Sequence, residues 1–576
     1  MTEINKTPEK RWAVRETRLD LSRALASCLN LSPLVAQVLI NRGIETPEAA
    51  QSFLSSRLAD LHSPLLMKDM GRATERIAAA IANKEKICIC GDYDVDGITA
   101  TTVVLLFLEG AGAHVAFHIP SRLTEGYGMS IATVKKLHAD GVSLIITVDC
   151  GVSAFDEVAC ARAHGIDVIV TDHHELPDRL PEAYAIINPK QLDCPFPFKG
   201  LAGVGVAFNL VMALRTKLRD SRFWQKGQEP NLKQYLDLVA MGTIADMVPM
   251  LDENRIFVHN GLEIIAQGCR PGIKALKNLC GIPDGPVAGN MIGFRLAPRL
   301  NAAGRMAEAD LSVQLLRTGS DDEATTLARK IDEENTRRQQ RERSTLTEAR
   351  NMVKKNGELP DSLILSSPGW HPGVIGLCAS RLSEEFSRPA ILFAVDEKSG
   401  ECKGSARTVK GFDLYGAIKQ CSSMLKAFGG HRDAAGLTVH LDKMPLFMRA
   451  FNAIVREQFA AGDFSPMLAI DAEIPLGELS HTMLAQIESL APFGPGNAEP
   501  VFSSRDIQSY SSMVVGKGHL KMKIKEDGQS FDAIGFNMGD RYSLNDGAIR
   551  LAFVPQFNLY NGQKLVQLNL LDIKNM

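Results

Sequence analysis

The sequence predicts an α/β protein with a doubly wound parallel sheet, a long connecting helix, a smaller α/β domain and a small β-barrel at its carboxyl end. Three observations lead to this prediction. Continuous apolar, β-branched runs alternate with helical runs between about residues 84 and 260, as expected for parallel strands covered on both faces. A highly charged helical stretch follows at 321–355. From about residue 465 onward, short strand-like runs separated by turn signals are typical of a barrel.

Length and composition describe a globular chain of several domains. Its 576 residues exceed the roughly 250–300 that a single core usually holds. The net charge of −3 excludes a polycation of the histone kind but leaves room for a local basic groove. Eleven cysteines without a CxxC pair, and an amino terminus without an apolar signal segment, indicate a cytoplasmic protein. No run of 18 apolar residues suggests a membrane span, so we expect no membrane partner.

The individual elements follow from local patterns. Strands of the first sheet are expected at 86–90, 114–119, 143–149, 167–172 and 183–189. Cys88 and Cys90 fall in the first of these strands, where we expect small core residues. Between Arg329 and Lys355, nine basic residues outnumber five acidic ones, which favours a solvated connecting helix, with phosphate contact as the alternative. The expected parts of the chain are a helical segment packed on the catalytic domain (1–80), the catalytic domain (81–320), the connecting helix (321–356), the second α/β domain (357–462) and the barrel (463–576).

The run GDYDVDG places three carboxylates directly after the first strand. Asp92, Asp94 and Asp96 stand at alternate positions, so an extended segment would bring them to one side. Carboxylates that close repel one another unless a cation lies between them. The alternative is a solvated turn, but a strand that ends in acids and opens onto a helix favours a divalent metal site.

Further acids and imidazoles follow other predicted elements. Asp149 ends the strand SLIITVD, Asp246 follows a helical run in GTIADMVP, and Asp172, His173 and His174 form TDHH after the strand DVIVTD. Taken singly, such an Asp is most often a helix cap, and such a His faces solvent. Together they meet at one edge, because the carboxyl ends of parallel strands lie side by side. Carboxylate and imidazole ligands without thiolate suit Mg²⁺ or Mn²⁺, and the surplus of carboxylates suggests two ions.

The motifs DYDVDG, TVDCG, TDHH and GTIADMVP resemble, in order and spacing, the four motifs of the DHH phosphoesterase superfamily. Further segments are similar to those of its bacterial exonucleases specific for single-stranded DNA, over about residues 40 to 576: PSRLTEGYG (120–128), LAGVGVAF (201–208), APRLNAAGR (297–305), WHPGVIGLCASRL (370–382), KGSART (403–408) and GGHRDAAG (429–436). The resemblance implies a DHH catalytic domain, a DHHA1 domain and a carboxyl-terminal OB fold.

The resemblance also implies roles for the residues at the strand ends. The metal ligands would be Asp94, Asp96, Asp149, His173 and Asp246, with Asp149 as the bridge between two ions. Many members carry a His where this chain has Cys90, so Asp92 is expected to take over as a ligand or to lie just behind the ligands. His174 would donate a hydrogen bond to the scissile phosphate, and Asp172 would orient an imidazole.

Other residues are candidates for holding the substrate. Arg299, Asn301 and Arg305 in PRLNAAGR are expected beside the reacting phosphate. Phosphate contacts, including a pocket for a free 5′ end, are expected from Arg122, Lys403, Ser405, Arg407 and His431. In the barrel, the basic candidates are Lys517, Lys521, Lys523 and Lys525. The alternative for each of these segments is an ordinary surface loop or a tight turn.

These observations predict a single-stranded-DNA-specific 5′→3′ exonuclease that releases mononucleotides by metal-assisted hydrolysis, in DNA repair and recombination. The polarity comes from the resemblance, as do the implied partners, single-strand-binding protein and a RecQ-type helicase. One alternative is a DHH phosphodiesterase acting on short oligonucleotides or cyclic dinucleotides, although such enzymes are generally shorter and lack the OB tail. The other is a DNA-binding scaffold without catalysis.

Overall fold

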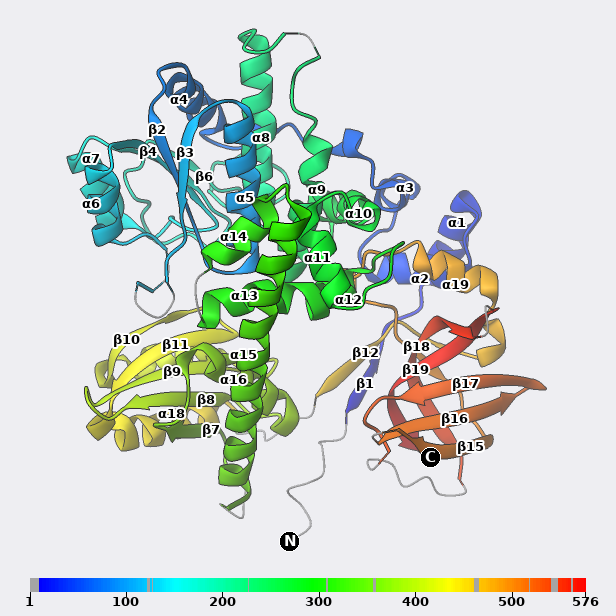
Figure 1. Ribbon diagram of the computed structural model, residues 1–576. Helices are drawn as coiled ribbons and strands as arrows, with labels where there is room; N and C mark the ends of the chain where they lie inside the picture. The colour runs from blue at the N-terminus through cyan, green and yellow to red at the C-terminus, as the bar shows by residue number, and fades with distance from the viewer. Residues whose placement is uncertain are drawn as a thin grey trace. The chain divides into compact units, whose positions relative to one another are not determined.

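The computed structural model divides the chain into two compact units (Figure 1). One unit comprises Gln51–Arg338 and Ala491–Ala498, and the other comprises Met1–Ala50, Gln339–Leu490 and Glu499–Met576. We call them the catalytic unit and the accessory unit. The structure describes residues 10–121, 125–126, 128–225, 227–306, 309–355, 359–459, 466–516, 518–539, 547–560 and 563–576. Arg122 and Lys517, two of the predicted DNA-binding residues, lie outside these ranges.

The catalytic unit contains the expected parallel sheet. Its strands lie in the order β3-β2-β4-β5-β6 and are all parallel: β2 (Lys86–Gly91), β3 (His114–His118), β4 (Val142–Val148), β5 (Asp167–Thr171) and β6 (Ala185–Ile187). Cys88 and Cys90 are buried in the core, as predicted. The predicted doubly wound fold is confirmed.

Helices cover both faces of this sheet (Figure 1). On one face, α6 (Ile131–Ala139) and α7 (Phe155–Ala163) pack through Val134, Leu137 and Val158. The other face carries the larger core, to which α4 (Met70–Ala82), α5 (Val95–Gly110), α8 (Gly203–Asp220) and α9 (Leu236–Ala245) contribute. The helix α5 is almost entirely buried because its residues are apolar or small on every side.

The remaining helices of the catalytic unit follow α9 along the chain. They are α10 (Asp252–Gln267), α11 (Pro271–Leu279), α12 (Gly289–Met291), the single-turn π-helix η4 (Ile292–Leu296), α13 (Ala297–Met306) and α14 (Asp310–Arg317). The PRLNAAGR segment lies within α13. The π-helix η4 packs beside α9, and α13 and α14 pack beside α5. The PRLNAAGR segment therefore packs against the core of the unit.

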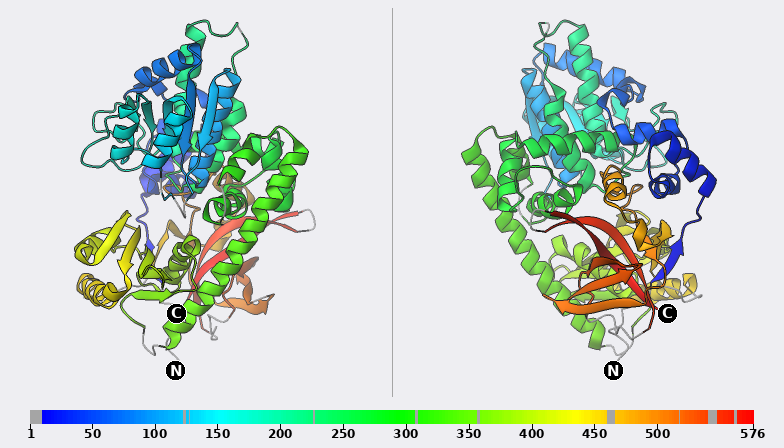
Figure 2. Two further views of the ribbon diagram at one scale, coloured as in Figure 1. Left: turned by 60° about the vertical axis from the view of Figure 1, so that its left-hand side comes forward. Right: turned by 90° about the vertical axis from the view of Figure 1, so that its right-hand side faces the viewer.

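The long charged helix is present with its predicted bounds. It is α15 (Asp321–Lys355), and it runs without a break (Figure 2). Its first part packs into the catalytic core through Leu327 and Ile331, whereas its last part packs into an accessory core through Leu346 and Val353. A single helix therefore takes part in two separate cores.

The accessory unit contains a second, mixed sheet in the order β10-β11-β9-β8-β7. Its strands are β7 (Leu363–Ser367), β8 (Ala390–Asp396), β9 (Glu401–Arg407), β10 (Leu425–Gly430) and β11 (Ala434–His440), of which only β7 and β8 pair in parallel. One core contains α17 (Leu414–Gln420) and α18 (Met444–Gln458), and another contains α16 (Pro372–Phe386) with the end of α15. This smaller α/β domain was predicted.

The carboxyl-terminal strands form the predicted barrel-like sheet (Figure 1). Its order is β13-β14-β18-β19-β17-β16-β15, and the strands are β13 (Ala472–Ile474), β14 (Phe502–Ser504), β15 (Ser509–Val515), β16 (His519–Glu526), β17 (Gln529–Gly535), β18 (Ile549–Tyr560) and β19 (Gln563–Asn575). A bridge between Ile507 and Ile549 joins the start of the β15 segment to β18 and closes the sheet on itself.

The amino-terminal segment differs from the expected one. Residues up to Ala50 belong to the accessory unit, whereas the chain from Gln51 onward belongs to the catalytic unit. Strand β1 (Arg11–Val14) pairs in parallel with β12 (Met467–Ile470), and Asn41 Nδ2 donates to the carbonyl of Asp471 at 3.0 Å. Residues 1–80 were expected as a helical segment packed on the catalytic domain, and the first part of this segment also pairs within the accessory unit, with residues more than 400 positions away.

Two helices near the amino terminus, α1 (Leu19–Leu29) and α2 (Pro33–Asn41), are bent by 113° relative to each other. Together they reach the length and apolar content of a membrane span, but no single helix in the described ranges does.

Candidate metal centre and nucleic-acid-binding residues

The predicted acids and imidazoles gather at the carboxyl edge of the parallel sheet. Gly91, Val148 and Thr171 are register partners at the ends of β2, β4 and β5. The chain therefore leaves all three strands at the same level, and the residues that follow are Asp92, Asp149 and Asp172. Asp246 reaches the same place from the carboxyl end of α9. The order of the sheet thus explains why motifs far apart in the sequence form one site.

The His173 ring shows which protonation state the site requires. Its Nδ1 lies 3.0 Å from the carbonyl oxygen of Leu201, which can only accept, so Nδ1 carries the proton. Its Nε2 then holds a lone pair, at 3.1 Å from Asp149 Oδ1 and 3.6 Å from Asp246 Oδ2. Neither Nε2 nor Asp246 Oδ2 has a hydrogen-bond partner among the described residues. A lone pair facing carboxylate oxygens is repulsive unless a cation lies between them, so this arrangement fits a metal.

The ligand atoms form overlapping triads. One triad is Asp96, His173 and Asp246, a second is Asp92, Asp94 and Asp149, and a third joins Asp149 to His173 and His174. Within each triad the ligand atoms lie within 4.8 Å of one another. Asp149 occurs in two triads, and its Oδ1 also faces the His173 nitrogen of the first. This is the position expected of a carboxylate shared between two cations.

Backbone groups orient Asp96. Its two carboxylate oxygens accept from the backbone N–H of Gly203 at 2.6 Å and of Val204 at 2.8 Å, at the amino end of α8. A side chain at Gly203 is excluded, because a Cβ there would meet Asp149 Oδ1 at 2.5 Å. The motif LAGVGVAF therefore serves the site through its backbone, which is a role that residue types alone did not reveal.

Asp149 adopts an uncommon backbone conformation. Its φ of 60° lies in the left-handed region, which residues other than glycine rarely adopt. Its backbone N–H donates to the carbonyl of Thr171 at 3.0 Å, which joins the ends of β4 and β5. Strain of this kind is usually retained where function needs it, and here it turns the carboxylate toward the other ligands.

Burial and like charges shift the pKa values of the site. Burial, followed by the charge of Asp94, raises the pKa of Asp96 to about 7. Burial, followed by the charge of Asp96, raises the pKa of Asp246 to about 9, and the same causes raise the pKa of Asp149 well above its usual range. Burial lowers the pKa of His173 to about 3, so the ring is neutral. A divalent cation would replace the protons that these acids otherwise retain.

Asp172 and His174 form a separate hydrogen-bonded pair. Asp172 Oδ1 accepts from His174 Nδ1 at 2.8 Å, and Oδ2 accepts from the Val152 N–H at 3.0 Å. Burial alone would raise the pKa of Asp172, but the hydrogen bond and charge of His174 and the backbone N–H donors of Val152 and His174 together lower it. Burial opposes a charge on His174, yet its bond to Asp172 raises the pKa of the imidazole. Asp172 thus orients an imidazole, and that imidazole is His174.

Arg299 and Asn301 of the PRLNAAGR segment form hydrogen bonds within the protein. Arg299 Nε donates to Asp332 Oδ1 of α15 at 2.8 Å, and its Nη1 donates to the Arg295 carbonyl. Asn301 Oδ1 accepts from the Val95 N–H at 3.1 Å, at the start of α5. A Cβ at Gly304 would lie 2.3 Å from the Tyr93 carbonyl oxygen, so glycine permits the helix to approach this loop. Asn301 therefore holds the acidic loop (Asp92–Asp96) in place, Arg299 joins α13 to α15, and Arg305 is half-buried at the end of α13.

The second sheet brings other candidates together. Lys403, Ser405 and Arg407 alternate along β9 and therefore share one face. Arg407 Nη1 donates to Ser405 Oγ at 3.2 Å, beside Gly376 of α16, where a Cβ would meet that Oγ at 2.8 Å. Arg407 pairs with Ala434, and the His431 N–H donates to the Ala434 carbonyl at 2.8 Å. His431 is therefore in the turn between β10 and β11, beside the carboxyl end of β9.

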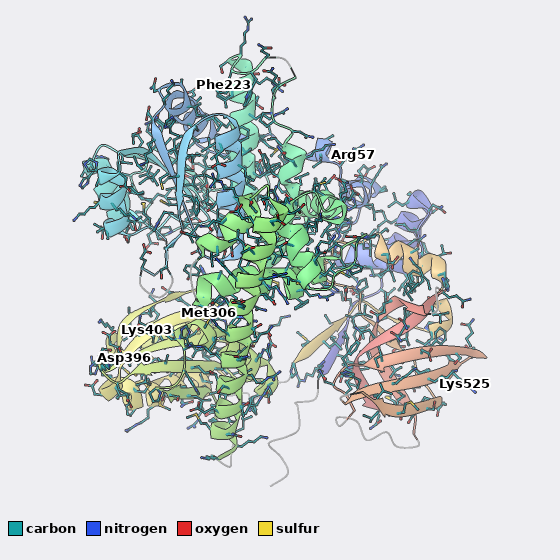
Figure 3. All side chains as sticks on the ribbon, viewed as in Figure 1. Arg57, Phe223, Met306, Asp396, Lys403 and Lys525 are labelled. Carbon is teal, nitrogen blue, oxygen red and sulfur yellow. The ribbon has the colours of Figure 1, made fainter. Side chains whose placement is uncertain are left out.

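The barrel lysines alternate as predicted. Lys521, Lys523 and Lys525 on β16 are exposed, whereas the residues between them are buried. Lys521 and Lys523 line a groove of about 500 Å³ that also contains Met513 and Asp532. Among the aromatic residues of the barrel, Phe531 and Phe553 are core residues, and Phe536 is exposed. Lys525 is labelled on the barrel and Lys403 on the second sheet in Figure 3.

Three family models match the chain. They are the DHH family amino-terminal domain over residues 86–243, the DHHA1 domain over 361–457 and the RecJ OB domain over 470–572. These matches confirm the fold that the resemblance implied.

Relatives and solved structures match nearly the whole chain. The "Single-stranded-DNA-specific exonuclease RecJ" of Bacillus subtilis is 39% identical over 98% of this chain and 70% of the relative. The protein of the same name from Escherichia coli is 36% identical over 93% of this chain and 95% of the relative. The crystal structure of RecJ from Thermus thermophilus in complex with Mn²⁺ superposes with a TM-score of 0.84 and 28% identity, over 98% of this chain and 80% of that one. The chain belongs to the RecJ family, whose named members are exonucleases specific for single-stranded DNA.

Proposed function

We propose that this protein is a metal-dependent 5′→3′ exonuclease that degrades single-stranded DNA to mononucleotides. The observation that carries the proposal is the overlap of the metal triads at Asp149, with the lone pair of His173 facing their carboxylates. Membership of the RecJ family supports the choice of substrate.

The proposed metal site holds two Mg²⁺ or Mn²⁺ ions. Asp92, Asp94 and Asp149 would hold one, while Asp96, His173 and Asp246 would hold the other. When bound, such a pair supplies an acidified water molecule and offsets negative charge on the leaving oxygen. Because both ions are doubly charged, the buried acids can remain ionised at neutral pH.

His174 and Asp172 are proposed to handle the phosphate. The Nδ1–H of His174 is directed to Asp172 at 2.8 Å, which fixes the ring and favours its protonated form. A protonated Nε2 is a charge-assisted donor for a phosphate oxygen. No serine or cysteine nucleophile is required in this scheme.

The DNA-binding residues are proposed in two groups. Ser405, Arg407 and His431, with Lys403 on the same strand face as the first two, are proposed to bind the terminal 5′ phosphate, which would give the polarity. Lys521, Lys523 and Lys525 are proposed to track the backbone of the strand along the barrel. Arg305 is proposed to contact DNA near the metal site, whereas Asn301 positions the acidic loop and Arg299 ties α13 to α15. Arg122 and Lys517 stay proposed phosphate contacts on sequence grounds.

We also propose the functional division of the chain and its setting. Residues 81–320 would cleave, 321–356 would connect, 357–462 would recognise the strand end and 463–576 would hold the strand. A cytoplasmic enzyme of DNA repair and recombination would meet single strands through single-strand-binding protein and a RecQ-type helicase.

Labelled oligonucleotides test the proposed function. DNA and RNA strands labelled at the 5′ or the 3′ end are incubated with Mg²⁺, Mn²⁺ or chelator. We expect immediate release of 5′-labelled mononucleotides from DNA, with none in chelator. Digestion limited to short oligonucleotides or cyclic dinucleotides would favour the small-substrate phosphodiesterase, and metal binding without cleavage would favour a scaffold.

A further inference from the structure

One phenylalanine of the catalytic unit lies outside the hydrophobic core. Phe294 is 83% exposed, more than any other phenylalanine in the described ranges. Its neighbours Ile292 and Leu296 in the same turn are fully buried. Burying a phenylalanine side chain normally stabilises a protein, and the exposed Phe294 does not contribute this stabilisation. An exposed aromatic ring on an otherwise well-packed helix calls for a functional explanation.

The backbone at Phe294 is also unusual. Residues Ile292–Leu296 form a π-helical turn between α12 and α13. Such single turns contain an extra residue and occur frequently at functional sites. The turn is anchored on both sides of Phe294, because a Cβ at Gly293 would lie 3.6 Å from Ile244 and the Arg295 guanidinium donates to the Cys280 carbonyl. The exposed ring is thus carried by a fixed backbone.

Two contacts place the helix that carries Phe294 close to the metal site. Gly293 packs on Ile244, two residues before the metal-site carboxylate Asp246. Seven residues after Phe294, Asn301 accepts from the N–H of Val95 in the acidic loop at 3.1 Å. At about 1.5 Å per helical residue, Phe294 and Asn301 are separated by roughly 10 Å along the helix. A strand whose phosphate reaches the metal site would pass within a few nucleotides of the ring.

We propose that Phe294 stacks on an unpaired base of the bound strand and thereby selects single-stranded over duplex DNA. This inference rests on the proposed function and deepens it. A base in a duplex has both faces covered by its neighbours, so only an unpaired strand offers a free face to a ring on the protein. Interleaved aromatic and basic groups are typical of single-strand binding, and here Arg305 follows Phe294 along the same helix.

Removing the ring measures its contribution. In the full-length protein, Phe294→Ala should lower kcat/KM on single-stranded oligonucleotides by about tenfold, within the range found for one base stacked on an aromatic side chain. Phe294→Trp should retain activity, whereas Phe294→Leu should not, because the aromatic face is what binds. The matched control is Phe223→Ala, another exposed phenylalanine of the catalytic unit, which lies at the opposite end of that unit from Met306, the last residue of α13 (Figure 3).

Abasic substrates separate stacking from structural effects. A single abasic nucleotide is moved along the strand, and the wild-type protein should lose about tenfold in kcat/KM at one position. Phe294→Ala should show no further loss at that position and normal losses elsewhere. Equal sensitivity of both proteins at every position, or an alanine variant with wild-type kcat/KM, would overturn the inference while leaving the exonuclease proposal intact.

A binding readout is independent of cleavage. In chelator, the added tryptophan of Phe294→Trp should be quenched by single-stranded but not by duplex DNA, relative to the wild-type protein with its three tryptophans. If the wild-type protein cleaves nothing with either metal, the exonuclease proposal fails, and this titration still tests stacking. An unquenched tryptophan, or a change in oligomeric state without a change in DNA binding, would contradict the stacking of Phe294 on DNA.

Discussion

The metal site and the basic face of the barrel use charge in opposite ways. At the metal site, five carboxylates and a neutral imidazole converge in a small volume, and Asp96, Asp149 and His173 are almost completely buried. On the barrel, Lys521, Lys523 and Lys525 stand apart along one strand and are exposed. The first arrangement is unfavourable without a cation, whereas the second is stable in water without any ligand.

The difference determines how much each residue should matter. Buried charges interact strongly because water screens them little, so losing one ligand changes the whole site. Exposed lysines contribute separately, and salt weakens each of them. We therefore expect very large effects from single substitutions at the metal site and small, additive ones on the barrel.

The largest effect is expected from Asp149→Ala. This change removes the carboxylate common to two triads, so kcat on single-stranded DNA should fall by at least about 10³-fold, which corresponds to several kcal/mol of lost metal-based stabilisation. DNA binding in chelator should change little. The control is Asp178→Ala, an acid on a loop of the same unit. Cleavage within tenfold of wild type would contradict the assignment of Asp149.

Cation and pH should affect stability together. The pKa values of Asp96 and Asp246 are raised to about 7 and about 9, above the value of about 3.9 in an unfolded chain. Their contribution to metal-free stability is therefore present below pH 4 and is lost as the pH rises toward 9. Mn²⁺ at about 100 times its Kd should raise Tm by about 5–10 °C at pH 8, and by less at pH 5.5. Thermal melts with Mn²⁺ or chelator measure this, and a Tm increment that is larger at the lower pH would count against the site.

An intermediate effect is expected at the 5′ phosphate. Arg407→Ala removes a charged donor, so KM for strands with a 5′ phosphate should rise by roughly 10- to 100-fold, and KM for strands with a 5′ hydroxyl should change much less. Arg407→Lys should restore part of the loss, because lysine lacks the bidentate geometry. Arg449→Ala, on α18 of the same domain, is the control. Equal effects on both kinds of strand would remove Arg407 from the proposed pocket.

The smallest effects are expected on the barrel. Replacing Lys521, Lys523 and Lys525 by alanine should weaken binding of long single strands and reduce the slope of log K against log salt by about 2, since each phosphate contact contributes about 0.7. Activity on very short strands should be unchanged. A triple replacement of Lys135, Lys136 and Lys233 provides a control of equal charge. An unaltered salt slope in the barrel variant would show that the strand does not follow this face.

The sequence predicted the sheet and the gathering of acids at its edge for one physical reason. Parallel strands must be apolar throughout and end at one edge, so acids that directly follow such strands could be placed together before any coordinates were known. The sequence also showed that Cys90 stands where many members of the superfamily have a histidine ligand. In the structure the Cys90 side chain is buried in the core, and Asp92 belongs to one of the metal triads.

The supporting contacts could not be predicted in this way. The carbonyl of Leu201 and the N–H of Gly203 serve the site as backbone groups, and any residue type has them. The pairing of Arg299 with Asp332 depends on how two helices pack. The pairing of β1 with β12 depends on segments distant in sequence, which local patterns do not connect. The exposure of Phe294 also depends on packing, because its residue type alone does not distinguish a core phenylalanine from an exposed one.

Diffraction from crystals soaked in Mn²⁺ tests the central claim most directly. Anomalous difference maps should contain two peaks, about 3.5–4 Å apart, on either side of Asp149, with His173 Nε2 bound to one of them. A map with no peak among these carboxylates, or with manganese bound only elsewhere on the chain, would contradict the account.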